Sequence, residues 1–179
     1  MRKVIKNIFK ENGFSILEII VVMLIIVIGM VGIASLNVQS IQAYNYNKNV
    51  LIASHLAQEG VELVRNKRDQ NWTDGNDWKS GEGAYSNTDI IQDDDYTIDY
   101  TGNIEDSVDS TDDEGARLKI DFTNGFYNHS FGENTIFYRI IEIEDNTDDD
   151  YFSLKCTVAW QERGRNHSYE VNAVFYDWR

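Results

Sequence analysis

The distribution of apolar and polar residues changes abruptly along the chain. Between Phe14 and Val38 the only charged residue is Glu18, and residues 19–33 contain no polar side chain. An apolar run of at least about 20 residues is long enough for a helix that spans a bilayer. We therefore predict a membrane-spanning helix over residues 14–38.

Downstream of Val38 the helical pattern continues but becomes amphipathic. Polar residues separate apolar ones that recur at roughly helical spacing, which are Ile41, Tyr44, Leu51, Ile52, Leu56, Leu63 and Val64. We predict that residues 39–68 continue the same helix, which then runs from Phe14 to about Arg68. The apolar stripe of this second half needs a folded domain to pack on.

The C-terminal part, residues 116–179, has the pattern of an antiparallel sheet. Phe152, Leu154, Cys156, Val158 and Trp160 alternate with more polar residues at a period of two. Further strands are expected at 136–143, 169–176 and 118–122, with a turn at 161–166. The predicted fold class is α+β, one long N-terminal helix packed on a C-terminal antiparallel β-sheet, with Cys156 as a small buried hydrophobe.

Residues 69–115 separate the helix from the sheet. They contain 15 of the 30 acidic residues and one basic residue, Lys79. We predict an acidic surface loop interrupted by one strand at 96–100. Acidic clusters at 93–95, 109–114 and 148–150 suggest calcium binding as an alternative to a solvated loop, but none has the spacing of an EF-hand, and no metal ligand is assigned.

Composition excludes several classes of function. The net charge of −14 leaves no basic surface for nucleic acid, so no direct nucleic-acid binding is expected. One cysteine and three scattered histidines, His55, His129 and His167, lack the spacing of a metal or nucleophilic site. We expect a protein that is not an enzyme and has no cofactor.

The leader, residues 1–13, carries four basic residues and one acidic residue, a net charge of +3. Basic residues beside the first apolar segment stay in the cytoplasm, so everything after about residue 40 is expected to be exported. A cleaved secretory signal is the alternative. It fits less well because the apolar run is long for a signal peptide and only a weak cleavage site, near Ala43, follows it.

Glu18 is the unusual residue of the apolar segment, because a carboxylate in a lipid-facing helix costs on the order of 2–3 kcal/mol unless it is partnered. It either lies near the cytoplasmic interface, where Lys10 is a possible partner, or meets a positive charge at the same end of the helix. Cleavage after Gly13 would create such a charge, the α-amino group of Phe14, where the helix dipole also favours a carboxylate.

The segment Gly13-Phe14-Ser15-Ile16-Leu17-Glu18 resembles the prepilin peptidase recognition site of type IV pilins and pseudopilins. The resemblance covers residues 1 to about 45 and implies a pilin-like fold, cleavage after Gly13, N-methylation of Phe14, and a Glu18 carboxylate that neutralises the amine of an adjacent subunit during assembly. It also implies prepilin peptidase, other pilin or pseudopilin subunits and an inner-membrane assembly platform as partners. The expected location is the cytoplasmic membrane, with the N-terminus inside, and then a cell-surface filament.

A second, weaker resemblance lies at residues 57–66, with Arg68, Asp69, Asn71 and Trp72 following, and is to the helix end of one branch of minor pilins. A single cysteine precludes the disulfide-closed loop of major pilins, and the absence of proline removes their usual helix kink. Both departures favour a minor pilin or pseudopilin. Gly29 and Gly32 indicate either close helix approach or simple tolerance of glycine in a membrane.

The expected function is that of a structural subunit assembled through its apolar helix into a pilus, a secretion pseudopilus or a DNA-uptake filament. The alternative is a membrane-anchored binding module or adhesin with an acidic, calcium-binding head. Substitution of Gly13 or Glu18 separates the two, because a simple anchor is indifferent to both changes.

Overall fold

The computed structural model describes residues 13–75, 78–79, 94–102, 104–105, 108, 110–111, 113–146 and 151–177. The chain divides into two compact units, Met1–Asn45 and Tyr46–Arg179. One helix, α1 (Ile16–Asp74), contributes to both units, and all the strands belong to the second. The predicted α+β class, a long N-terminal helix packed on an antiparallel sheet, is confirmed.

Helix α1 ends later than its sequence predicts. The carbonyl of Ser15 accepts bonds from the backbone N–H groups of Glu18 and Ile19, at 3.0 and 3.2 Å, and so closes the first turn. The helix continues past Arg68 to Asp74, so residues 69–74 are not part of a loop. It stops at Gly75, whose φ of +80° suits glycine and whose N–H donates to the carbonyl of Trp72 at 3.3 Å.

The described residues form seven strands, and every pair is antiparallel. They are β1 (Asp94–Ile98), β2 (Ile104–Glu105), β3 (Arg117–Ile120), β4 (Tyr127–Asn128), β5 (Glu133–Asn146), β6 (Tyr151–Glu162) and β7 (Arg165–Tyr176), with a short 3-10 helix, η1 (Glu114–Ala116), before β3. The strands expected at 118–122, 136–143, 152–160 and 169–176 are β3, β5, β6 and β7. The strand expected at 96–100 is β1, which begins and ends two residues earlier.

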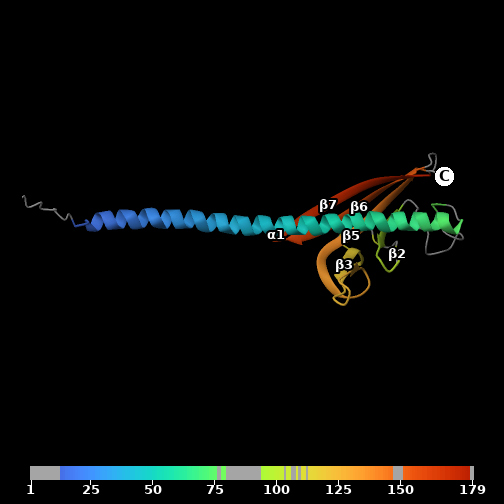
Figure 1. Cartoon of the computed structure of the whole chain (residues 1–179), viewed down its shortest axis with the longest axis horizontal. Coiled ribbons are helices and arrows are strands. Elements are labelled where there is room, and N and C mark those ends of the chain that lie inside the picture. The colour runs from blue at the N-terminus through green and yellow to red at the C-terminus, as the bar shows by residue number, and fades with distance from the viewer. Residues whose placement is uncertain are drawn as a thin grey trace, which may run out of the picture. The chain divides into compact units, whose positions relative to one another are not determined.

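Strand β5 organises the sheet, and it curves strongly in Figure 1. One of its edges pairs with β6 from Phe137 to Asn146, while its other edge is shared between β3 and β1. Strand β7 pairs with β6 in unbroken register. The two are joined by a tight turn in which Arg163 and Gly164 have φ of 53° and 74°, the geometry of a type I′ hairpin.

One face of the sheet packs on the second half of α1 through small residues. The buried helix residues are Ala53, Leu56, Ala57, Gly60, Val61, Val64 and Asn71. Of the stripe predicted from sequence, Leu56 and Val64 are buried and Ile52 and Leu63 are half-buried, but Ile41, Tyr44 and Leu51 are exposed. Leu51 lies in the same unit as the sheet, and the prediction was wrong for it because it counted large apolar side chains, whereas alanine and glycine make much of the contact. Ile41 and Tyr44 belong to the other unit.

The opposite, outer face of the sheet carries a smaller core. Val108, Ala116 and Ile140 form a buried cluster with Tyr138 packed against it. Part of the segment predicted as an acidic surface loop therefore lies on the outer face of β5.

Candidate functional site

The residues that resemble a peptidase site lie at the start of α1. Gly13, Phe14 and Ser15 precede the helix, and Glu18 lies in its first turn. Phe14 is 79% exposed, and no described atom lies within 4 Å of the position that a Cβ on Gly13 would occupy. The Glu18 carboxylate is near the positive end of the helix dipole, which favours a negative charge there.

The apolar residues that follow Glu18 are exposed within the described structure. From Ile19 to Val38 every large hydrophobic side chain is at least 47% exposed. This part of α1 includes a window with a mean hydropathy of 3.1, so the helix is long and apolar enough to cross a membrane. A continuous apolar surface of this length needs lipid or other apolar helices to cover it.

Gly29 and Gly32 lie within this exposed stretch. A Cβ added at either position would meet no described atom within 4 Å. Neither glycine is therefore required by packing inside the described chain, and both explanations offered by the sequence stand.

Histidine and cysteine do not converge on a reaction centre in the described residues. His55 is exposed on α1, His129 follows β4, and His167 stacks on Trp160 and meets the Tyr46 ring edge-on. Cys156 is fully buried on the helix-facing side of β6, as predicted, and burial raises the pKa of its thiol to about 11. A thiol in that state is a poor nucleophile.

The described residues contain no group of three acidic, histidine or cysteine side chains placed to hold a metal ion. Of the suggested calcium clusters, residues 93, 109, 112 and 148–150 lie outside the described residues. Asp113 does lie within them, and its Oδ1 accepts the N–H of Gly115 at 2.9 Å as the cap of η1.

The sequence did not single out Arg139, a fully buried arginine on the helix-facing side of β5. Its guanidinium donates to the carbonyl of Leu56 at 3.0 Å and to the carbonyl of Ile98 at 2.6 Å. The Glu59 carboxylate lies 3.6 Å from the guanidinium. Arg139 thus joins α1, β1 and β5, and its one sequence signal is a basic residue between Phe137 and Ile141 in an apolar alternation.

A second polar contact joins the end of β1 to β4. The Asp99 carboxylate is buried and accepts the backbone N–H of Thr101 at 2.9 Å and that of His129 at 3.0 Å. The pKa of His129 is lowered to about 4, mainly because burial disfavours the charged imidazole; the Arg139 charge also lowers it, and the Asp99 carboxylate opposes both. These contacts stabilise the compact unit Tyr46–Arg179, called the head below. Asp99 and Thr101 also line an open hollow beside Lys67 and Asp69 of α1.

Comparison of the chain with protein-family models, with curated proteins and with solved structures finds no match. The functional assignment therefore depends on the residues at the start of α1 and on the exposed helix that follows them.

Proposed function

We propose that this protein is a structural subunit of a type IV pilus-like filament, of the minor pilin or pseudopilin kind. The observation that carries the proposal is the segment Gly13–Glu18 directly before an exposed apolar helix. A prepilin-like N-terminus needs five elements in a fixed order. They are a short basic leader, a glycine, a phenylalanine, a glutamate four residues later and an apolar run. Each element is present once, at the required spacing.

The start of α1 is suited to cleavage after Gly13 by prepilin peptidase. Gly13 and Phe14 are exposed and lie before the first helical residue, so a peptidase can bind this backbone without unwinding a helix. The cut leaves the α-amino group of Phe14 one turn from the Glu18 carboxylate. Methylation of this amine retains its positive charge.

Assembly in this proposal exchanges lipid for neighbouring helices around residues 14–38. Apolar helices associate in such surroundings by close packing and by hydrogen bonds, because lipid tails are as apolar as the side chains. A lone Glu18 buried among helices would be costly, and the Phe14 amine of an adjacent subunit provides its counter-charge.

The exported head is the acidic part of the mature chain. Removal of the leader, with its net charge of +3, changes the net charge of the protein from −14 to −17. Apart from Glu18, the charged residues of the mature chain lie beyond the apolar segment, which suits a head in water and a helix among other helices.

The proposal is tested by co-expressing the chain with a prepilin peptidase and determining its N-terminus by mass spectrometry. We expect a mature chain that starts at Phe14 and, with a methylating peptidase, carries one added methyl group. A Gly13→Val variant is expected to remain uncut, whereas Gly29→Val is cut normally. An intact wild-type precursor, or a cut near Ala43, would overturn the proposal in favour of a plain anchor or a secretory signal.

A further inference from the structure

The outer face of the sheet is hollowed near the β6–β7 turn. Strand register places Tyr138, Ala159 and Ser168 side by side on three adjacent strands, and Gln161 opposite Asn166 two positions further along β6 and β7. Because Ala159 and Ser168 are small and Tyr138 is large, the surface of this row drops beside the Tyr138 ring. The resulting hollow has a volume of about 350 Å³, within the range of about 300–1,000 Å³ typical of small-molecule sites.

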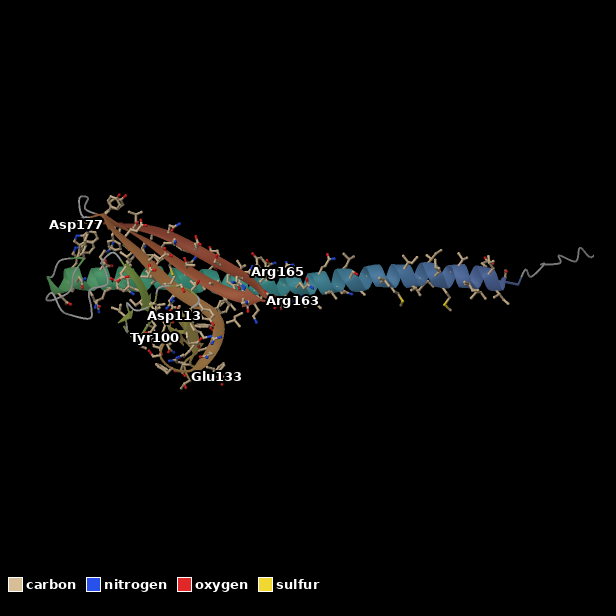
Figure 2. All side chains as sticks on the ribbon, turned by 180° about the vertical axis from the view of Figure 1, so that it is seen from behind. Tyr100, Asp113, Glu133, Arg163, Arg165 and Asp177 are labelled. Atoms are coloured by element: carbon tan, nitrogen blue, oxygen red, sulfur yellow. The ribbon has the colours of Figure 1, made fainter. Side chains whose placement is uncertain are left out.

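The described lining of the hollow differs in charge from the rest of the head, which is highly charged. Its lining in the described part of the chain is Thr111, Tyr138, Ala159, Trp160, Gln161, Asn166, His167 and Ser168, without an acidic residue, lysine or arginine. Two other hollows of the same unit differ, since one includes Lys67 and Asp69 and the other Glu142 and Lys155. Arg163 and Arg165, labelled at the neighbouring turn in Figure 2, do not line the uncharged hollow.

The aromatic wall of the hollow is held in place by its neighbours. Tyr138 packs against the Val108, Ala116 and Ile140 cluster, and the guanidinium of Arg117 lies 5.1 Å from the centre of its ring. Arg117 is itself fixed by Glu114, at 2.8 Å. A ring held in this way loses little freedom when a ligand packs beside it.

The polar groups of the hollow are amides and hydroxyls, which both donate and accept hydrogen bonds. The Gln161 side-chain amide donates to Oδ1 of Asn166 at 3.2 Å, which orients the pair. Thr111 and Ser168 add hydroxyl groups at two other positions. Such groups match the hydroxyls of a ligand and provide no counter-charge for an ionic one.

We propose that this hollow binds a neutral saccharide, with the ring of Tyr138 against the apolar face of a sugar and the Gln161–Asn166 pair bonded to its hydroxyls. The combination of one fixed aromatic side chain with uncharged hydrogen-bond donors and acceptors is what favours a neutral saccharide as the ligand. The site does not depend on the filament role, and its test needs neither cleavage nor assembly.

The test is isothermal titration calorimetry on the full chain in lauryldimethylamine oxide micelles, because a glycoside detergent would compete. The probes are maltotriose, cellotriose and tri-N-acetylchitotriose. We expect at least one to bind, Asn166→Ala to weaken its binding by about tenfold or more, equivalent to about 1.4 kcal/mol, and Ala159→Leu to abolish it by filling the hollow.

Asn172→Ala is the matched control, since Asn172 is on the same strand and face but lines the charged hollow. It is expected to bind as the wild type does. Circular dichroism checks the fold of Ala159→Leu. If that variant misfolds, Asn166→Ala still gives an independent result, because Asn166 is exposed. The proposal is overturned if none of the three saccharides binds, or if Asn166→Ala binds as tightly as Asn172→Ala.

Discussion

A Cβ on Gly60 would lie 2.7 Å from Sγ of Cys156, closer than two such atoms approach in proteins. Gly60 is on the buried face of α1, and Cys156 is on β6. The same Cβ would lie 3.4 Å from Cδ of Arg139 and 3.4 Å from Cδ1 of Ile141. The glycine therefore sets how closely the helix approaches the sheet.

We expect Gly60→Ala to lower the free energy of unfolding by about 1–3 kcal/mol, because overpacking a close helix–sheet contact forces side chains or backbone to shift. Chemical denaturation followed by tryptophan fluorescence measures the change. Cys156→Ala in the same chain removes the clashing sulfur, so the double variant should lose less than the sum of the two single changes. Strict additivity would show that the sulfur is not what excludes a side chain at position 60.

The stability of the head should depend on pH through His129. Its pKa is about 4 in the folded chain and about 6.5 when unfolded, so below the higher value the unfolded state binds the proton first. The contribution of His129 to the free energy of unfolding is therefore present above about pH 6.5 and is lost as the pH falls toward 4. Linkage gives a loss of about 2 kcal/mol from this group between about pH 7 and pH 5.

Denaturation of the wild type, His129→Gln and His55→Gln at both pH values isolates this contribution. His129→Gln should lose less stability on acidification than the wild type, by about 2 kcal/mol. His55 is exposed, and its variant should follow the wild type. Equal losses in all three proteins would count against a neutral, buried His129.

Arg139→Met should lower the free energy of unfolding by about 1–3 kcal/mol, because it leaves the buried carbonyl of Ile98 without this donor and separates Glu59 from its counter-charge. The stability of Arg139→Lys is expected to fall between that of the wild type and that of Arg139→Met, since an ammonium group lacks the planar fork that reaches two carbonyls. The exposed Arg163→Met serves as the control and should change stability by no more than about 0.5 kcal/mol. An Arg139→Met protein as stable as this control would contradict the proposed role.

Under the proposed filament function, Glu18→Gln should be cut after Gly13 but should not enter filaments, because the Phe14 amine then loses its counter-charge in an apolar environment. Immunoblots of sheared surface filaments and of membranes measure the distribution. Glu62→Gln is the matched control, since Glu62 is exposed on the same helix and pairs with Arg65. Equal amounts of both variants in the sheared fraction would show that Glu18 is dispensable for assembly.

The sequence predicts the strongly periodic elements of this fold well. The β6–β7 hairpin is an example, because alternation over 152–160 and 169–176 and a turn at 161–166 indicate the same structure. The turn itself is shorter than predicted, since β6 runs to Glu162 and β7 begins at Arg165. The apolar half of α1 after Glu18 is equally clear from the sequence, because an uninterrupted apolar run of this length is typical of a helix that is able to cross a membrane.

Contacts between distant residues were not predictable from one sequence. Arg139 is 83 positions from Leu56 and 41 from Ile98, and Asp99 is 30 positions from His129. Neither local propensity nor periodicity relates such positions. The hollow around Ala159 depends in the same way on the register of β5, β6 and β7, which becomes known only when the strands are paired.

Strand β7 gives the acidic composition a further consequence. It presents twelve residues without a bulge, and in the described part of the chain β6 is its one pairing partner. A long regular edge of this kind can template pairing with another chain, and proteins commonly prevent this with charge. Net negative charge should oppose such pairing between heads at neutral pH, and this repulsion should weaken as the pH falls toward about 4.5, the isoelectric point that the composition of the 179 residues gives. We therefore expect the surplus of carboxylates to act against association through this sheet edge, and mild acid to be the condition under which heads associate.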